Sequence, residues 1–319
     1  MSSTSVVSVI SSFAISAVLG PVVIPFLRKL KAGQNIRDDG PKSHLKKAGT
    51  PTMGGILILL SVVATSLMFV EKYPKIIPIL FLTFGFGLIG FLDDYIKVVL
   101  HRSMGLRAWQ KMAGQLLITG IFAYYLQYYT NISLAMRVPF LPGKFLDFGA
   151  WNVPVLFFIV LGTVNGTNFT DGLDGLAASV TVIVAVFFSV VAIGTGSGIE
   201  PITCAVAGAL MGFLLFNVYP ASVFMGDTGS LALGGFVAAS AYLLQLPLFI
   251  AIVGLVYLLE VLSVILQVSY FKLSGGKRIL RMAPLHHHFE LCGFSETRIV
   301  AAFSILTAIM GLVAFLGLS

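Results

Sequence analysis

The chain has 319 residues, of which 57% are hydrophobic and only 10% are charged. About a quarter of the residues in a soluble domain are charged, so this composition excludes an ordinary soluble protein and indicates a polytopic membrane protein. The net charge of +7 does not indicate a nucleic-acid partner, because membrane proteins concentrate Lys and Arg in cytoplasmic loops. The two cysteines, Cys204 and Cys292, provide neither a disulfide framework nor a metal-ligand spacing.

Ten apolar segments approach the length of about 20 residues that a helix needs to cross a bilayer. We therefore predict an all-α membrane protein in which residues 1–319 form a single integral membrane domain. The first segment lacks a preceding basic stretch and is expected to be a span, not a removable signal peptide. In chain order the predicted spans are Val6–Leu27, Met53–Val70, Ile76–Leu92, Met112–Tyr129, Val153–Asn168, Leu176–Ile193, Ile202–Val218, Leu231–Leu244, Leu248–Phe271 and Ile299–Leu318.

The connections between these segments differ in charge, and the difference predicts the topology. Lys and Arg are frequent after the first, third and ninth segments, and such connections face the cytoplasm. Both termini are then external, as is the connection between the fourth and fifth segments. This connection, Asn131–Trp151, alternates apolar residues around Pro139 and Pro142 and is expected to form a small external hairpin.

Five aspartates fall on the predicted cytoplasmic side, near the ends of apolar segments where carboxylates are costly. Asp93 and Asp94 close the third segment, and Lys97 follows one turn later. Adjacent helix residues point about 100° apart, so one carboxylate is expected to face a substrate while the other contacts a metal or a lysine. A solvated helix end is the structural alternative, but paired acids are unfavourable at the negative end of a helix.

A second acid pair, Asp171 and Asp174, lies in the polar string NGTNFTDGLDG. If a helix begins near Thr170, the spacing of three places both acids on one face, with Asn168 or Thr170 as the cap. A purely structural role at a helix N-terminus is the alternative. Asparagines and carboxylates together are suited to hydrogen bonding with a base or sugar, and Asn165 belongs to the same string.

The fifth acid, Asp227, lies between Gly226 and Gly229 in FMGDTGSLALGG. The glycines let a metal or phosphate approach the backbone closely, but the Walker pattern is absent. Phe224, three residues earlier, is either a ring on which a base stacks or an ordinary apolar packing residue. This segment is therefore a candidate metal or phosphate site.

His286, His287 and His288 follow three basic residues in a predicted cytoplasmic connection. Their spacing does not match the helical zinc motif HExxH. A lone histidine is usually structural, but three in succession beside guanidinium groups are suited to phosphate binding. Glu260 is the one acid deep within an apolar segment, and it is expected to face the helix bundle or a groove, near Ser263 or Gln267.

Taken together, these side chains predict an active site on the cytoplasmic face of the membrane. Carboxylate oxygens without thiolates favour Mg²⁺ or Mn²⁺ over zinc. Mg²⁺ is commonly held by one or two carboxylates together with substrate phosphates. A site of this kind at the membrane rim indicates one water-soluble phosphorylated substrate and one lipid substrate.

Several motifs, in this order along the chain, resemble those of the polyprenyl-phosphate N-acetylhexosamine-1-phosphate transferases: LDDYIK, NFTDGLDGLA, FMGDTGSLALGG and PLHHHFE. The strings GTPTMGG and PLHHHFELCGFSE resemble in particular the phospho-N-acetylmuramoyl-pentapeptide transferase branch of this family. The resemblance extends from about Asp38 to Arg298. Phe169 departs from the leucine common in the family, but it is also apolar and puts nothing serious in doubt.

The resemblance implies ten spans, a homodimer in the bacterial plasma membrane and a Mg²⁺-dependent reaction. Undecaprenyl phosphate attacks UDP-N-acetylmuramoyl-pentapeptide, which gives lipid I and UMP. By the same resemblance Asp227 and Asp93 are metal-binding, and Asp94 and His286 join them as catalytic residues. The implied substrate-binding residues are Lys46, Lys97, Lys111, Asn165, Asn168, Asp171, Asp174, Phe224, Gln267, His287 and His288.

The mechanism predicted from these roles is a direct in-line displacement. Asp227 holds the metal on the pyrophosphate, Asp93 orients or deprotonates the lipid phosphate, and Asp94 supports the metal or Lys97. A two-step route through an aspartyl-phosphate is the chemical alternative.

Three other functions compete with this prediction. The nearest is a sister enzyme that uses UDP-N-acetylglucosamine, against which GTPTMGG and PLHHHFE argue. A proton-coupled transporter would place its acids near the membrane midplane, not on one face. An intramembrane aspartyl protease needs two acids that share a proton inside the membrane, which five acids at the rim do not match.

Overall fold

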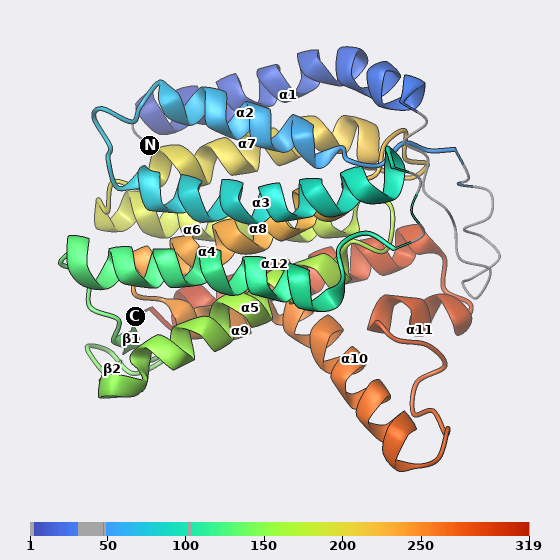
Figure 1. The fold of residues 1–319 in the computed structure, drawn as a ribbon. Helices are drawn as coiled ribbons and strands as arrows, with labels where there is room; N and C mark the ends of the chain where they lie inside the picture. Colours follow the sequence, from blue (N-terminus) through green and yellow to red (C-terminus); the bar gives the residue numbers. More distant parts are fainter. Residues whose placement is uncertain (1–2, 31–46, 48, 101, 103, 319) are drawn as a thin grey trace.

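The computed structural model describes residues 3–30, 47, 49–100, 102 and 104–318, which form a helical bundle with one small hairpin (Figure 1). Each of the ten predicted apolar segments is helical over most of its length, with ends that differ by a few residues. The helices are α1 Ser3–Lys29, α2 Gly55–Leu67, α3 Ile76–Val98, α4 Ala108–Tyr129, α5 Asn152–Thr170, α6 Leu176–Thr195, α7 Glu200–Asn217, α8 Gly226–Leu243, α9 Ile250–Val253, α10 Leu255–Leu273, α11 Leu285–Leu291 and α12 Glu296–Leu316.

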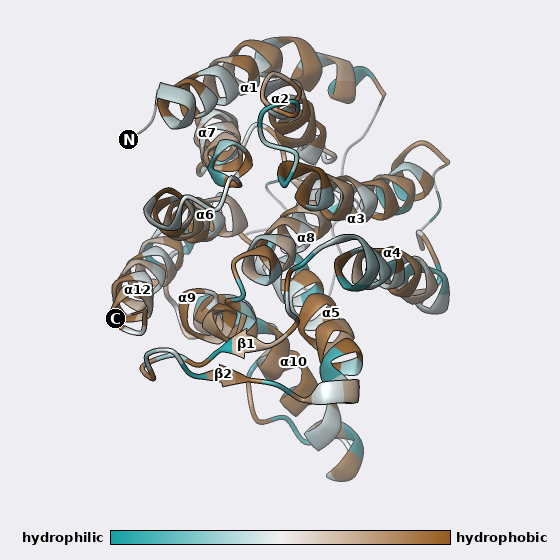
Figure 2. Cartoon of the chain, turned by 90° about the vertical axis from the view of Figure 1, so that its left-hand side faces the viewer, coloured by the Kyte–Doolittle hydropathy of each residue, from teal (hydrophilic) through white to brown (hydrophobic). Residues whose placement is uncertain are grey.

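Seven of the described helices are long and apolar enough to cross a membrane: α1, α3, α5, α6, α7, α10 and α12. Hydrophobic residues accordingly make up most of the length of the helices (Figure 2). Helix α2 has only 13 residues, and α4 and α8 occupy two further predicted segments. An all-α polytopic membrane protein is therefore confirmed, while the count of ten spans and the orientation stay predictions.

Small side chains bring the helices into close contact, as is common where helices associate in lipid. Helix α1 turns a stripe of fully buried serines inward, at Ser5, Ser8, Ser12 and Ser16. On the facing helix α7, a β-carbon added to Gly208 would lie 2.3 Å from the carbonyl oxygen of Val9. The glycine therefore permits contact between the backbones of α1 and α7.

Helix α8 lies at the centre of the bundle, and every residue from Thr228 to Leu243 is buried. Its amino end packs against glycines of two neighbouring helices. A β-carbon on Gly90 of α3 would lie 2.0 Å from the carbonyl oxygen of Asp227, and one on Gly55 of α2 would lie 2.1 Å from the amide nitrogen of Gly229. These close approaches fix the position of the amino end of α8.

The predicted hairpin is present, and it lies at the opposite end of α8. Strands β1 Met136–Arg137 and β2 Phe145–Leu146 pair antiparallel, with Met136 opposite Leu146. The amide of Arg137 bonds to the carbonyl of Gln245, just beyond α8, over 2.9 Å. Since α8 has 18 residues, the hairpin is about 27 Å from Asp227 along the helix axis.

The predicted ninth segment is divided, and this is a correction to the single span expected there. Gly254 separates the short helix α9 from α10, and its amide bonds to the carbonyl of Ile250 over 2.8 Å. Helix α10 then leaves the main bundle at a steep angle (Figure 1). Much of its surface is consequently exposed, as at Leu266 and Leu273.

Candidate active site

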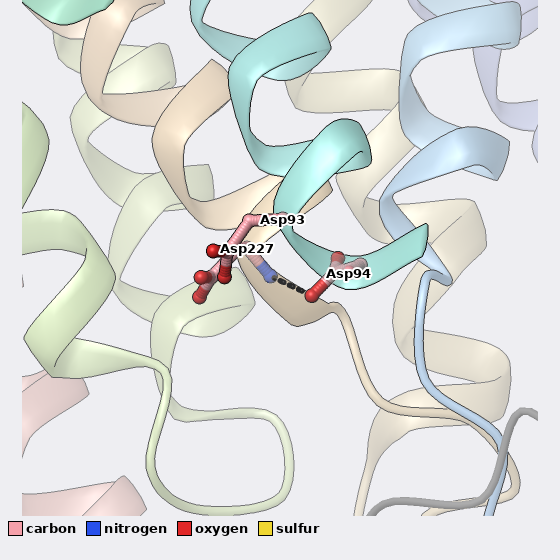
Figure 3. A group of neighbouring side chains, drawn as sticks. All are labelled: Asp93, Asp94 and Asp227. Carbon is pink, nitrogen blue, oxygen red and sulfur yellow. Dashed lines mark hydrogen bonds between the residues drawn. The ribbon is translucent and has the colours of Figure 1, made fainter. Parts of the chain in front are cut away.

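Three of the five aspartates meet where the last turns of α3 face the amino end of α8 (Figure 3). Asp93, Asp94 and Asp227, here called the acid cluster, each offer a carboxylate oxygen, and these oxygens lie within 4.8 Å of one another. Gly90 lies one turn before Asp93 and contacts the backbone of Asp227, so the close packing of α3 on α8 brings the acids together. The structure thus brings together three acids from two motifs that the sequence assigned to one active site.

Asp94 points toward the backbone of α8 and is only 4% exposed. Its carboxylate accepts hydrogen bonds from the amide of Asp227 over 3.3 Å and from the amide of Thr228 over 2.9 Å. The hydroxyl of Thr228 donates a third bond of 2.7 Å. Both carboxylate oxygens are thus used to cap α8, whereas the sequence predicted that Asp94 would support a metal or Lys97.

Asp93 points the other way, as expected for adjacent helix residues, and is 2% exposed. One of its oxygens accepts a 2.7 Å bond from the amide of Leu106, and the other is paired with Lys97 one turn later. Asp93 therefore positions a lysine and the connection that leads into α4. The predicted contact between one acid of the pair and Lys97 is confirmed.

Asp227 has the most exposed side chain of the acid cluster, at 19%, and carries the most cationic partners. Lys111 lies 2.9 Å and Lys97 3.3 Å from its Oδ2 atom. The amide of Asn168 donates to its Oδ1 atom over 2.8 Å and to the hydroxyl of Ser230 over 2.8 Å. Three residues predicted to contact the substrate therefore surround the acid predicted to hold the metal.

Asp171 and Asp174 do not begin a helix, which corrects the expectation from their spacing. Helix α5 continues through Thr170, and both acids lie in the turn before α6 starts at Leu176. Gly175, with φ of +78°, allows this turn because a side chain would be strained there. Burial, together with the charges of Asp227 and Asp94, raises the pKa of Asp171 well above its usual range.

Asp174 belongs to a second charged group, here called the Lys47 cluster and formed by Lys47, Asp174 and Glu296. The ammonium of Lys47 lies 2.6 Å from a carboxylate oxygen of each acid. Burial lowers the pKa of Lys47, but the hydrogen bonds and charges of the two acids outweigh it and hold the pKa above its ordinary value. A cavity of about 570 Å³ is lined by all three residues.

The Lys47 cluster contains two residues, Lys47 and Glu296, that were not among the predicted site residues, although Lys47 opens the string KAGTPTMGG, which includes the motif GTPTMGG. The sequence favoured Lys46, which lies outside the described residues, over its neighbour Lys47. Glu296 was treated only as part of the string PLHHHFELCGFSE. The ammonium of Lys47 also lies 6.0 Å from the ring centre of Phe224, so this predicted stacking residue borders the cluster.

His286 and Glu260 form a buried pair that joins α10 to α11. Their side chains are 1% and 0% exposed, and His286 Nδ1 lies 3.2 Å from a Glu260 oxygen. Glu260 also accepts the amide of Leu285 over 2.8 Å and that of His286 over 3.2 Å. The expectation that Glu260 faces the bundle is confirmed. Its partners, Leu285 and His286, belong to the histidine segment.

The same histidine contacts the turn that carries Asp171. A β-carbon on Gly172 would lie 2.1 Å from His286 Nε2, so only glycine fits between them. The catalytic role predicted for His286 stays a prediction, and in this conformation its side chain is 1% exposed. The side chain of His286 packs between α10 and the turn after α5.

Four other predicted substrate-binding residues make contacts within the protein. His287 Nδ1 lies 2.7 Å from Glu290, and His288 Nδ1 accepts the amide of Arg281 over 3.1 Å. Gln267 bonds to backbone atoms of Ile279 and Leu280 and so holds the connection after α10. Asn165 donates to Gln115 of α4 over 3.1 Å. The structure does not bring these four residues into the acid cluster.

The acid cluster has the donor set that Mg²⁺ or Mn²⁺ prefers. All its candidate ligands are carboxylate oxygens, without a thiolate or imidazole, which suits a hard cation. Asp227 and Asp93 are the members whose carboxylates point away from the α8 backbone. Each of these two carboxylates also has at least one ammonium partner, which shows that this end of the site attracts positive charge.

Comparison with known proteins identifies the family of this chain. Residues 76–245 match the family model described as glycosyl transferase family 4, and residues 47–59 match phospho-N-acetylmuramoyl-pentapeptide-transferase signature 1. The chain is 51% identical over 314 residues to a protein of that name from Clostridium botulinum strain Eklund 17B, which covers 98% of this chain and 95% of the relative. A relative of the same name from Clostridium perfringens strain 13 is 48% identical and covers 98% of both chains.

Proposed function

This chain belongs to the phospho-N-acetylmuramoyl-pentapeptide-transferase family, and we propose that it transfers phospho-N-acetylmuramoyl-pentapeptide from its UDP-linked precursor to undecaprenyl phosphate. The products are lipid I, a peptidoglycan precursor, and UMP. A relative of that name at 51% identity over nearly the whole chain carries this conclusion. The acid cluster with its two lysines provides a site of the kind that phosphoryl transfer needs.

The proposed reaction is a direct displacement at the β-phosphorus of the UDP-linked substrate. An oxygen of the lipid phosphate forms a bond to that phosphorus while the bond to the bridging oxygen breaks, and UMP leaves with the bridging oxygen. The lipid phosphate is already largely ionised near pH 7, since its second pKa is about 6, so little proton removal is required. Asp93 therefore need not act as a strong base, and in addition to its proposed share in the metal site it holds Lys97 and the backbone of Leu106.

Charge neutralisation is the main task of the side chains around Asp227. Lys97 and Lys111 offer two ammonium groups on one side of its carboxylate, and Asn168 fixes the other oxygen. Asp227 and Asp93 would hold a Mg²⁺ ion, which when bound acts as a Lewis acid on the pyrophosphate. Asp94 contributes by fixing the amino end of α8, and hence Asp227, in position.

The nucleotide half of the substrate is assigned to the neighbouring surface. Phe224 and the Lys47 cluster lie there, and Asn168, which binds Asp227, lies near the end of α5, just before the turn that carries Asp171 and Asp174. The proposal places this whole surface on the cytoplasmic side of a bacterial plasma membrane, with ten spans in all. It also takes the functional unit to be a homodimer.

The decisive experiment measures UMP release by the purified protein from UDP-N-acetylmuramoyl-pentapeptide. Release should require both polyprenyl phosphate and Mg²⁺, and it should stop when EDTA is added and resume when Mg²⁺ is restored. UDP-N-acetylglucosamine, supplied in parallel, should give no UMP above background. Trapping of a labelled phosphoglycosyl-enzyme without lipid acceptor would contradict the direct displacement.

A further inference from the structure

Glu296 lies in the first turn of α12. It connects two segments of the surface formed by Phe224 and the Lys47 cluster, here called the nucleotide surface because the nucleotide half of the substrate is assigned to it. A single carboxylate oxygen, Oε1, accepts a 2.6 Å bond from the ammonium of Lys47 and a 2.6 Å bond from the backbone amide of Asp174. Its side chain is 9% exposed, so these bonds are shielded from water. Hydrogen bonds to a charged group of this kind are about twice as strong as neutral ones.

The two partners of Glu296 are themselves linked to further parts of the surface. Lys47 bonds to Asp174 Oδ1 over 2.6 Å, and Asp174 Oδ2 accepts the amide of Ala221 over 2.9 Å. Lys47 also faces the ring of Phe224. Four segments distant in sequence therefore meet here: the residues before α2, the α5–α6 turn, the α7–α8 connection and the start of α12.

We propose that Glu296 is a positioning residue for the nucleotide substrate, which holds Lys47 beside Phe224 and fixes the turn that carries Asp174. The proposal rests on the proposed function, because it assigns the neighbouring cavity to the nucleotide half of that substrate. Glu296 acts through Lys47 and Asp174. Its Oε1 atom is already occupied by two donors, and its charge has the same sign as a pyrophosphate.

Loss of the Glu296 carboxylate has different consequences for the two substrates. Among the described residues, Lys47 would keep Asp174 as its one acidic partner, and the buried amide of Asp174 would lose its acceptor. Both changes loosen the nucleotide surface, whereas the acid cluster keeps all its contacts to α3, α4 and α5. Nucleotide affinity should therefore fall while the chemical step and the lipid site are preserved.

The test compares Glu296→Ala and Glu296→Gln with wild type in the UMP-release assay. For Glu296→Ala, the KM for UDP-N-acetylmuramoyl-pentapeptide should rise about tenfold, while kcat and the KM for polyprenyl phosphate change less than about twofold. Glu296→Gln keeps an acceptor for both bonds but loses the charge, so its KM for the nucleotide substrate should lie between those of wild type and Glu296→Ala. Glu71→Ala removes an exposed glutamate between α2 and α3 and should match wild type.

A double-mutant cycle with Lys47→Ala tests whether Glu296 acts through that lysine. The combined variant should raise the KM by clearly less than the product of the two single effects, because coupled residues are not additive. Equal changes in both KM values, or a fall in kcat with an unchanged nucleotide KM, would overturn the positioning role. If wild type releases no UMP, the proposed function itself fails, so the two failures are distinguishable.

Discussion

The acid cluster and the Lys47 cluster are both groups of opposite charges, but they are built from different parts of the fold. The acid cluster stands on the ends of α3 and α8, where glycine contacts leave no room for movement. The Lys47 cluster joins one residue from each of two connections, before α2 and between α5 and α6, to the first turn of α12. Its position is set by ion pairs and hydrogen bonds, not by helix packing.

This difference matches the different demands of chemistry and of binding. A displacement of about 1 Å at a reacting centre can cost a hundredfold in rate, so the reacting phosphates need a rigid support. Groups that bind a large nucleotide tolerate small adjustments, and connections allow the substrate to enter. Substitutions in the acid cluster should therefore lower kcat, whereas substitutions in the Lys47 cluster should raise KM.

The strongest test of this contrast is Asp227→Asn. The change removes the charge that gathers Lys97, Lys111 and the proposed Mg²⁺, so kcat should fall on the order of a thousandfold. UMP release under saturating substrates is the measurement, with Asp147→Asn in the hairpin as the matched control. Near-normal turnover in Asp227→Asn would reject the assignment of the reaction to the acid cluster.

Gly90→Ala tests the rigid support directly, without altering a charged group. The added methyl group would collide with the backbone of Asp227, which should lower kcat about a hundredfold and destabilise the fold by about 1–3 kcal/mol. Gly162→Ala in α5 is the control, because its β-carbon would meet nothing within 4 Å. A normal kcat in Gly90→Ala, with melting measured in detergent, would show that α8 can shift harmlessly.

Thr228→Ala removes one of the three bonds to Asp94, so a smaller effect is expected. Loss of this buried hydrogen bond should cost about 1 kcal/mol of stability and lower kcat only a few-fold, because two backbone amides still bind Asp94. Thr307→Ala in α12, whose hydroxyl bonds only within its own helix, provides the comparison. If both variants behave alike, the cap on α8 has no special role in the reaction.

The fold was largely predictable from the sequence because apolar length alone marks helices that cross a membrane. The helix that ends at Thr170 was less predictable. The spacing of Asp171 and Asp174 is compatible with either a helix N-terminus or a turn. The structure has a turn, which the positive φ of Gly175 allows. Gly254 likewise divided a segment whose hydropathy is continuous.

Within the site, sequence patterns identified the acids but not their partners. Asp93, Asp94 and Asp227 stood out because carboxylates beside apolar segments are costly. Lys47 and Glu296 lie 249 positions apart, and each resembles an ordinary charge in a polar connection. The positions of Asp94 and His286 depend on which atoms of α8 and α10 face them, and these contacts are set only by the tertiary packing.

The position of Asp227 in the first turn of α8 gives the reaction centre an electrostatic property that belongs to the backbone. The aligned peptide dipoles of a helix place about half a positive elementary charge at its amino end. That partial charge is met first by the carboxylate of Asp94, which accepts the amides of Asp227 and Thr228, and it favours negative charge at this end of α8. No substitution of a side chain can remove it, so a residual attraction for phosphate should remain even when the acids or lysines are replaced.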